Sequence, residues 1–230
     1  MQPSVDDLLQ ELSAVIGALG DEGGLVSPSI YDTAQRLRFA PPATGVGPGL
    51  AWLLRQQLDD GGWGEPTAPT AQDVSTLAAV VALATYRHDA EAQSAIARGL
   101  AFLRSRAAQW GEIHLDAVPI AAEMIIPALL DDAARLGLPI DRTPYARLFA
   151  LREKKLNYVR RAPLQLNSAP TYSWEALGLP YSPDVLDPRT GVGHSPAATA
   201  AWLRAAHAAD ASPDRIAQAE AYLTRAEAST

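Results

Sequence analysis

Residues 56–64 read QQLDDGGWG and close a segment whose apolar residues recur at helical spacing. Gly61 and Gly62 end this helix in the way that glycines at helix C-termini do, and Trp63 follows at once. A large indole directly after a helix end typically fills a gap between packed helices. The stretch therefore predicts a helix and turn of a helical fold, with Trp63 as a structural residue. The apolar positions of the segment are Leu50, Leu53, Leu54 and Leu58.

The same helical period recurs on both sides of this stretch, with serines as N-caps and glycine or proline at the ends. No alternation of apolar and polar residues runs for six or more positions, so the chain is predicted to be all-α. Helix pairs joined by turns with glycine and aromatic residues favour an α/α barrel, and an irregular bundle is the alternative. Expected helices cover residues 5–19, 29–40, 48–58, 73–86, 90–107 and 119–136, and three more begin at residues 143, 195 and 212.

Two further expectations concern these helices. Asp73 is predicted to cap the N-terminus of the helix over residues 73–86. Residues 119–136 form either one long helix or two pieces joined at Pro127. In the domain organisation that follows, residues 1–22 are an N-terminal helix with one apolar side, and residues 23–230 form the α/α barrel-type domain.

Composition excludes several classes of function. The chain has 230 residues, of which 48% are hydrophobic, and this is enough to bury a sizeable core. It has no cysteine, which excludes disulfides, thiolate metal sites and cysteine nucleophiles. The net charge of -7 repels nucleic acid phosphates. No apolar run reaches the roughly 18 residues of a membrane span, and Asp6 and Asp7 are unlike a signal peptide, so we expect a cytoplasmic protein.

Six segments follow one another along the chain: SIYDTAQRL, QQLDDGGWG, DVSTLAAVVAL, VPIAAEMIIPALL, ALREKKL and GVGHSPAATAAWL. Together they resemble the γ domain of class II terpene cyclases, particularly bacterial diterpene cyclases of the copalyl or halimadienyl diphosphate type. The resemblance covers about residues 29–203, in the order of the family, and implies an α/α barrel-type γ domain. The matching pairs are SIYDTAQRL with SxYDTAWxA, QQLDDGGWG with QxxDGSWG, DVSTLAAVVAL with DRLLNTLACVxAL, VPIAAEMIIPALL with PIGFEIVFPALL, ALREKKL with LRxxKL, and GVGHSPAATAAWL with GSxxSSPASTAxxL.

The acid of this family is the central Asp of a DxDD motif in a β domain, where it protonates the distal alkene of geranylgeranyl diphosphate. The chain contains only bare acidic pairs, at residues 6–7, 59–60 and 131–132, without an Asp two places before. The resemblance therefore implies the γ subunit of a two-chain cyclase, with the catalytic β domain on a separate chain. The alternatives are a non-catalytic γ-like protein that binds and stabilises a partner, and an unrelated α/α enzyme or binding module.

Candidate substrate-binding residues follow from the same resemblance. Lys155 matches the diphosphate-contacting Lys of LRxxKL, and Arg160 and Arg161 extend a basic cluster that includes Lys154. The competing interpretation is a basic helix end that complements the helix dipole. Tyr172, in SAPTYSWEALG, falls where plant enzymes have a His involved in the final deprotonation. It is a candidate for lining the cavity.

Candidate metal ligands lie in GEIHLDAVPIAAE, just before the PIGFE-like segment. The family has an acidic motif here that assists binding of magnesium and diphosphate, so Mg²⁺ is the expected cofactor. Glu112 and Asp116 are the candidate ligands, although the consecutive acidic run of the family is absent. A solvated loop is the alternative, and His114 between them is more typical of polar surface than of a ligand.

Four other prominent residues are predicted to be structural. Tyr31 and Asp32 open a helix, where Asp32 would cap or brace a neighbouring helix. Trp63 and Trp174 are expected to be core residues.

Overall fold

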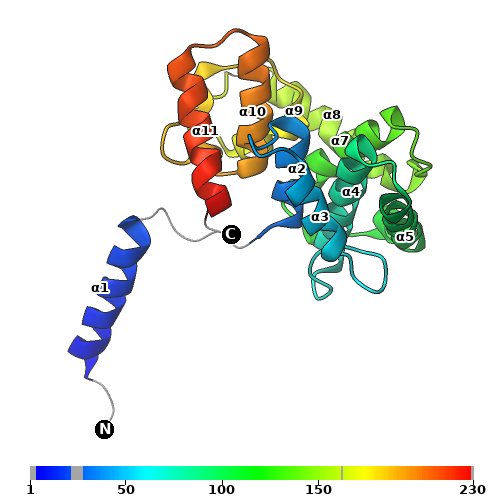
Figure 1. Cartoon of the computed structure of the whole chain (residues 1–230), viewed down its shortest axis with the longest axis horizontal. Helices are drawn as coiled ribbons and strands as arrows, with labels where there is room; N and C mark the ends of the chain where they lie inside the picture. Colours follow the sequence, from blue (N-terminus) through cyan, green and yellow to red (C-terminus); the bar gives the residue numbers. More distant parts are fainter. Residues whose placement is uncertain (1–3, 22–27, 162, 229–230) are drawn as a thin grey trace.

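The computed structural model describes residues 4–21, 28–161 and 163–228, and these are predominantly helical (Figure 1). The helices are α1 (Val5–Asp21), α2 (Ile30–Phe39), α3 (Gly47–Arg55), α4 (Pro69–Tyr86), α5 (Ala90–Arg106), α6 (Ala108–Glu112), α7 (Ala122–Arg135), α8 (Ala146–Val159), α9 (Trp174–Leu177), α10 (Pro196–Ala208) and α11 (Pro213–Ala228). Short 3₁₀ turns are η1 (Leu115–Ala117), η2 (Thr143–Tyr145), η3 (Ala169–Ser173) and η4 (Pro183–Val185). Strands β1 (Leu186–Asp187) and β2 (Gly191–Val192) pair antiparallel.

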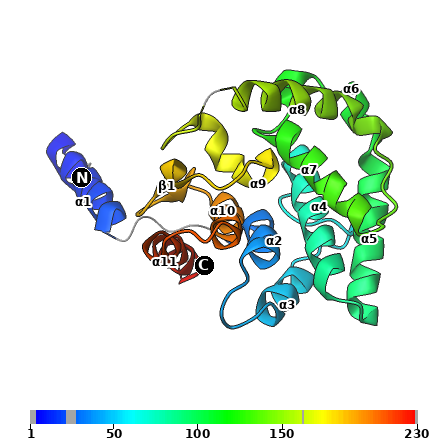
Figure 2. The ribbon, with the colours of Figure 1, turned by 90° about the horizontal axis from the view of Figure 1, so that it is seen from above.

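The core is built around α4 and α10 (Figure 2). Helix α4 packs against α2, α5 and α7, and its residues from Thr76 to Leu83 are buried on all sides. Helix α10 packs against α2, α9 and α11. The all-α prediction is confirmed, but the described helices pack around these two central helices and do not close into a barrel. No helix of the described part is long and apolar enough to cross a membrane.

Trp63 occupies the position that the opening stretch predicts. Its side chain is fully buried, and its indole Nε1 donates a hydrogen bond of 2.6 Å to the carbonyl of Leu53. Its backbone N–H donates to Thr76 Oγ1 at 2.9 Å, which ties the turn to α4. Gly61 has a φ of +91°, and a Cβ there would lie 2.8 Å from the carbonyl oxygen of Arg98. Only glycine fits this turn without strain.

The helix starts agree with the serine and proline signals, with one exception. Ser29 and Ser195 cap α2 and α10 through their side chains. Asp32 braces α10, as predicted, because its Oδ1 accepts the backbone N–H of Ala197 at 3.1 Å. The prediction for Asp73 was wrong: α4 begins at Pro69, so Asp73 lies inside the helix. Proline suits the first helical turn because it has no N–H to leave unpaired.

Three other segments differ from the expected pattern. Helix α3 ends at Arg55 and not at residue 58, so Gly61 and Gly62 lie in the turn that follows it and do not end the helix. Helix α7 runs without a break through Pro127, and it begins after Ala121, whose φ of +61° interrupts any helix from residue 119. Residues 179–194 contain the hairpin of β1 and β2, in which Leu186 pairs with Val192, although the sequence predicts no strand. Each strand has two residues, which is too short for any periodic signal.

Helix α1 extends away from the rest of the fold (Figure 1). It begins as predicted, with Ser4 Oγ accepting the backbone N–H of Asp7 at 3.1 Å. All of its described side chains are exposed, the apolar ones included. The expected boundary between residues 22 and 23 lies outside the described residues.

Candidate functional site

The candidate site is a cavity of about 410 Å³ between segments that are distant in sequence. The first turn of α7, the C-terminal half of α8, η3 and α9 each contribute part of its wall. Most of the lining is apolar, and its charged residues are Glu123, Lys154 and Lys155. The lining residues are Ala121, Glu123, Met124, Lys154, Lys155, Tyr158, Val159, Ala169, Pro170, Tyr172, Ser173 and Leu177.

Lys155 and Glu123 form an ion pair at the wall of this cavity. The Glu123 side chain is 12% exposed, whereas Lys155 is 55% exposed and therefore accessible to a ligand. Lys154 lines the same cavity. Sequence reasoning missed Glu123, which lies in a predominantly apolar segment. Its place in the PIGFE-like segment was the signal that could have identified it.

Tyr172 lines the cavity, and its backbone packs against the backbone of Gly193. Gly193 has a φ of +58°, and a Cβ there would lie 2.3 Å from the Cα of Tyr172, so the two backbones are in direct contact. Burial, followed by the negative charges of Glu123 and Glu175, raises the pKa of the Tyr172 hydroxyl to about 12. The phenol therefore stays protonated near neutral pH and presents a neutral aromatic ring to the cavity. The resemblance led to Lys155 and Tyr172 separately, and the fold brings them together.

Ala121 marks the start of α7 at the cavity wall and has a left-handed backbone. This conformation costs a non-glycine residue about 1 to 2 kcal/mol. Such strain persists where the surrounding structure holds it, and it is concentrated at functional sites. The first turn of α7, where the helix dipole is partially positive, therefore lies at the wall of the same cavity.

Glu175 is a buried carboxyl one helical turn after Tyr172. Tyr31 donates its hydroxyl to Glu175 Oε1 at 2.5 Å, and Gln35 Nε2 donates to the Tyr31 hydroxyl at 3.2 Å. Glu175 Oε2 is buried without a hydrogen-bond partner. Desolvation raises the pKa of Glu175 to about 7. Tyr31 is thus structural, as predicted, because its hydrogen bond to Glu175 joins α2 to α9.

We expect Glu175 to make stability depend on pH. Its pKa is about 7 in the folded protein against an ordinary 4.5, so the folded state favours the protonated form. Its stabilisation is complete below pH 4.5 and is lost as pH rises through 7. Relative to a Glu175→Gln variant, which cannot titrate there, the wild type should lose on the order of 2 to 3 kcal/mol across this window.

Urea unfolding of both proteins at several pH values measures this difference. The control is Glu91→Gln, which removes an exposed carboxylate on α5. Parallel stability profiles for wild type and Glu175→Gln would show that the buried carboxyl does not titrate in this range.

The remaining predicted site residues lie outside the cavity. Arg160 and Arg161 are exposed just beyond α8 and do not line it. Asp116 is 92% exposed and lies 3.4 Å from His114 Nδ1, on a surface turn, and Glu112 is also exposed. Among the described residues, no group of three or more His, Cys, Asp or Glu side chains could hold a metal ion. Trp174 is 4% exposed and belongs to the core, as predicted.

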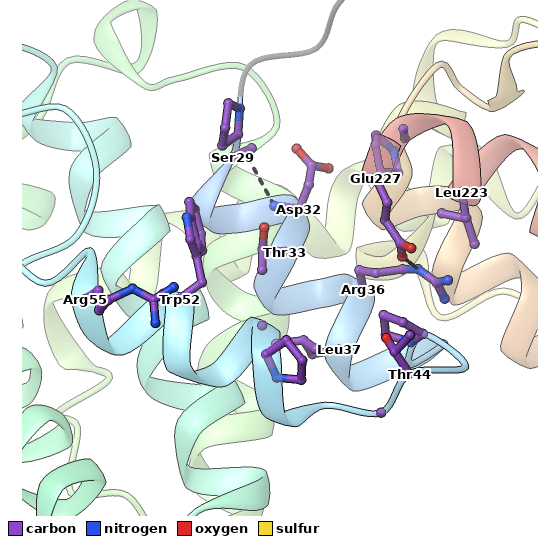
Figure 3. Close-up of a pocket in the computed structure, with 17 residues that line it drawn as sticks. Ser29, Asp32, Thr33, Arg36, Leu37, Thr44, Trp52, Arg55, Leu223 and Glu227 are labelled. Carbon is purple, nitrogen blue, oxygen red and sulfur yellow. Dashed lines mark hydrogen bonds and ion pairs between the residues drawn. The ribbon is translucent and has the colours of Figure 1, made fainter. Parts of the chain in front are cut away.

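A second cavity, of about 400 Å³, lies between α2, α3 and the ends of α10 and α11 (Figure 3). Its walls combine Trp52 and several prolines with an ion pair of 2.8 Å between Arg36 and Glu227. Asp32 lines it but is occupied in bracing α10. None of the predicted substrate or metal residues reaches this cavity, so it is not the primary candidate.

A smaller cavity of about 230 Å³ lies near the C-terminal ends of α2, α4 and α7, with Arg204 of α10 at its wall. Arg38 and Arg135 both pair with Asp132, and Arg204 stacks on the ring of Phe39 at 4.3 Å. The C-terminal end of each helix carries roughly half a negative charge, which arginines at these positions offset. We therefore attribute this basic cluster to helix packing.

Comparison with known proteins agrees with this fold. No protein-family model matches the chain. The (+)-kolavenyl diphosphate synthase of Herpetosiphon aurantiacus is 39% identical over an aligned length of 241 residues. The alignment covers 98% of this chain and 46% of that enzyme. The solved ent-copalyl diphosphate synthase from Streptomyces platensis is 30% identical with a TM-score of 0.63, covering 95% of this chain and 46% of that chain.

A solved ent-copalyl diphosphate synthase from Arabidopsis thaliana has the same fold, with a TM-score of 0.64 and 22% identity over 93% of this chain and 31% of that one. The chain spans about half the length of the bacterial relatives that it matches. Each of these alignments covers at least 93% of this chain. The chain is therefore homologous to bacterial class II diterpene cyclases over about half of their length.

Proposed function

We propose that this chain is the γ-type subunit of a two-chain class II diterpene cyclase. It would form one wall of the active site, and a separate β subunit would carry the DxDD acid. The observation that carries the proposal is the cavity in which Lys155, Glu123 and Tyr172 meet. The names of the relatives describe enzymes that form kolavenyl and ent-copalyl diphosphates.

The chemistry of the cavity suits a prenyl diphosphate, and geranylgeranyl diphosphate is the proposed substrate. Lys154 and Lys155 supply cationic donors for phosphate oxygens, and the N-terminal end of α7 adds a partial positive charge. Arg160 and Arg161, just beyond α8, would extend this basic surface toward the diphosphate. The apolar remainder of the wall would contact the hydrocarbon chain.

We assign the acid that protonates the alkene to the β subunit, because Glu175, the protonated carboxyl described above, does not line the cavity. That step needs a carboxylic acid kept protonated in a dry pocket, and the 230 residues contain no DxDD motif. The residues of this chain would instead bind the diphosphate, exclude water and hold the neutral Tyr172 ring beside the reacting carbons. The diphosphate itself would be retained in the product.

Mg²⁺ is the proposed cofactor, and carboxylates of this chain and phosphate oxygens of the substrate would be its ligands. It usually binds one or two carboxylates together with phosphate oxygens and water. Glu112 and Asp116 would supply the carboxylates, and their exposed positions mean that phosphate and water would complete the shell. Cyclisation in the presence of a chelator tests this requirement directly.

The proposal is tested by reconstitution. The chain is mixed with a DxDD-bearing β protein, and conversion of geranylgeranyl diphosphate is measured for each protein alone and for the mixture. We expect turnover only in the mixture. Full activity of this chain alone would refute the two-chain arrangement.

Substitution of Lys155 is expected to weaken catalysis in the reconstituted enzyme. Lys155→Gln should lower kcat/KM by about ten- to a hundredfold, because a hydrogen bond to a charged group contributes about 1.5 to 3 kcal/mol. Arg104→Gln, on the exposed surface of α5, is the matched control for loss of one positive charge. Equal activity of the two variants would remove Lys155 from the substrate site.

A second function is a γ-like protein that only binds and stabilises a partner. The exposed apolar residues of α1 favour a binding role without requiring catalysis. A stable complex with the β protein that leaves its turnover unchanged would favour this function over the first.

A further inference from the structure

The second cavity, between α2, α3 and the ends of α10 and α11, has the features of a site for a small amphiphilic molecule. Its volume of about 400 Å³ lies within the range of ligand pockets. Figure 3 shows Trp52 and Arg55 of α3 on one side of it and Leu223 of α11 on the other, with α2 between them. It shares no lining residue with the cavity of Lys155. A ligand held here would therefore be separate from the substrate proposed above.

The apolar part of the wall is rigid before any ligand binds. Leu37 and Leu223 are buried, and Trp52 is half-buried. Because proline fixes its own φ, the prolines of the wall have little conformational freedom to lose on binding. Such a preformed apolar surface favours the hydrocarbon part of a ligand. The prolines are Pro28, Pro42, Pro48 and Pro196.

Several polar side chains of the second cavity have hydrogen-bond donors to spare. Within the described part of the chain, the Arg55 guanidinium has no hydrogen bond or ion pair, and the indole N–H of Trp52 has no acceptor. Both groups can only donate. Because they are three residues apart on α3, they project from the same side of that helix. The hydroxyls of Thr33 and Thr44, also without a partner among the described residues, can donate as well.

The two acids of the second cavity are already engaged. Glu227 pairs with Arg36 at 2.8 Å, and the Arg36 side chain is only 14% exposed. Asp32 Oδ1 accepts the backbone N–H of Ala197. A cationic ligand would compete with these partners for the carboxylates, whereas an anionic ligand would meet the unpaired Arg55. The cavity therefore favours a negatively charged head group.

We propose that the second cavity binds an amphiphilic anion, a short apolar chain that ends in a carboxylate or a phosphate group. The head group would accept hydrogen bonds from Arg55 and from the indole of Trp52. The apolar chain would lie over α2 toward Leu223. This inference does not depend on the proposed cyclase, so the 230-residue chain is sufficient to test it.

The experiment follows acrylamide quenching of tryptophan fluorescence in the full chain. Trp52 is half-buried, whereas the other four tryptophans are buried, so quenching reports mainly on the second cavity. We expect decanoate and decyl phosphate to protect Trp52, and the one that protects at lower concentration identifies the preferred head group. Decanol and decyltrimethylammonium carry the same chain with a neutral or a positive head group. Each should bind at least about threefold more weakly than the better anion.

Substitution of Arg55 tests the position of the head group. Arg55→Gln should weaken binding of the better anion by about three- to tenfold, because the guanidinium is exposed and its attraction is partly screened. Arg104→Gln, which removes an exposed positive charge on α5, should leave binding unchanged. Both variants should melt like the wild type, since neither side chain is buried.

Four results would overturn the inference. Trp52 would remain unprotected by both anions, or decanol or decyltrimethylammonium would protect it as well as they do. Arg55→Gln and Arg104→Gln would bind the better anion equally. Protection that persists in Trp52→Phe would place the ligand elsewhere on the chain. None of these results bears on cyclisation by the reconstituted enzyme, so the proposed function stands or fails separately.

Discussion

Replacement of Trp63 by Ala is expected to lower the free energy of unfolding by about 3 to 5 kcal/mol, the range for large aromatic residues removed from cores. The indole is fully buried, and its Nε1 donates to the carbonyl of Leu53 at 2.6 Å. Its ring also fills the space beside Gly99, where a Cβ would lie only 2.8 Å from Trp63 Cζ3. The substitution would leave a cavity between α3, α4 and α5 and would remove the indole donor from the Leu53 carbonyl.

Urea unfolding of the isolated chain measures this effect. The control is Trp52→Ala, which truncates the same side chain at a half-buried position in α3 and should destabilise much less. Trp63→Phe should fall between wild type and Trp63→Ala, because it keeps an aromatic ring but loses the donor to Leu53. An unchanged unfolding midpoint for Trp63→Ala would remove this residue from the core.

The helical framework could be predicted because its signals are local. Apolar residues at helical spacing, serine N-caps and glycine stops each involve neighbours within about one turn of a helix. Ser29, Ser195 and Trp63 were predicted from such signals, and the fold confirms them. Asp32 was also predicted correctly as a brace, although its partner Ala197 could not be named because it lies 165 residues away.

Features that depend on long-range contacts were missed or misread. Asp73 precedes an apolar run, which looks like a cap, and its real partners come 33 to 37 residues later. The described helices pack around α4 and α10 and do not close into a barrel. A loose repeat of helix pairs in the sequence cannot distinguish these two arrangements. The hairpin of β1 and β2 is too short to produce any sequence pattern.

The candidate site was predicted only in part. Lys155 and Tyr172 were identified by resemblance, and the fold places both at one cavity. Glu123 was missed because a carboxylate in an apolar segment gives no local sign of its ion pair with a lysine 32 residues away. Glu175 was missed because its burial depends on Tyr31, which is 144 residues away.

Replacement of Asp73 by Ala should destabilise the fold by about 3 to 5 kcal/mol, the range for breaking a buried ion pair by removing one partner. Asp73 is 3% exposed and accepts three hydrogen bonds, from Arg106 Nε at 2.5 Å, Gln109 Nε2 at 2.7 Å and Trp110 Nε1 at 2.8 Å. Without it, the Arg106 guanidinium loses its carboxylate while its Nη2 is already buried without a partner. The fully buried Trp110 indole would also lose its acceptor.

The three donors lie at the end of α5 and in α6, so Asp73 is the contact that fixes this corner of the fold to α4. Domains of this kind are stable by about 5 to 15 kcal/mol, so the expected loss is a large fraction of the total. Urea unfolding compares Asp73→Ala with Asp59→Ala, an exposed aspartate that should change stability by less than about 0.5 kcal/mol. Asp73→Asn should fall between them, since an amide still accepts from Trp110 but cannot neutralise Arg106. Similar unfolding curves for Asp73→Ala and Asp59→Ala would show that the three hydrogen bonds do not hold this corner together.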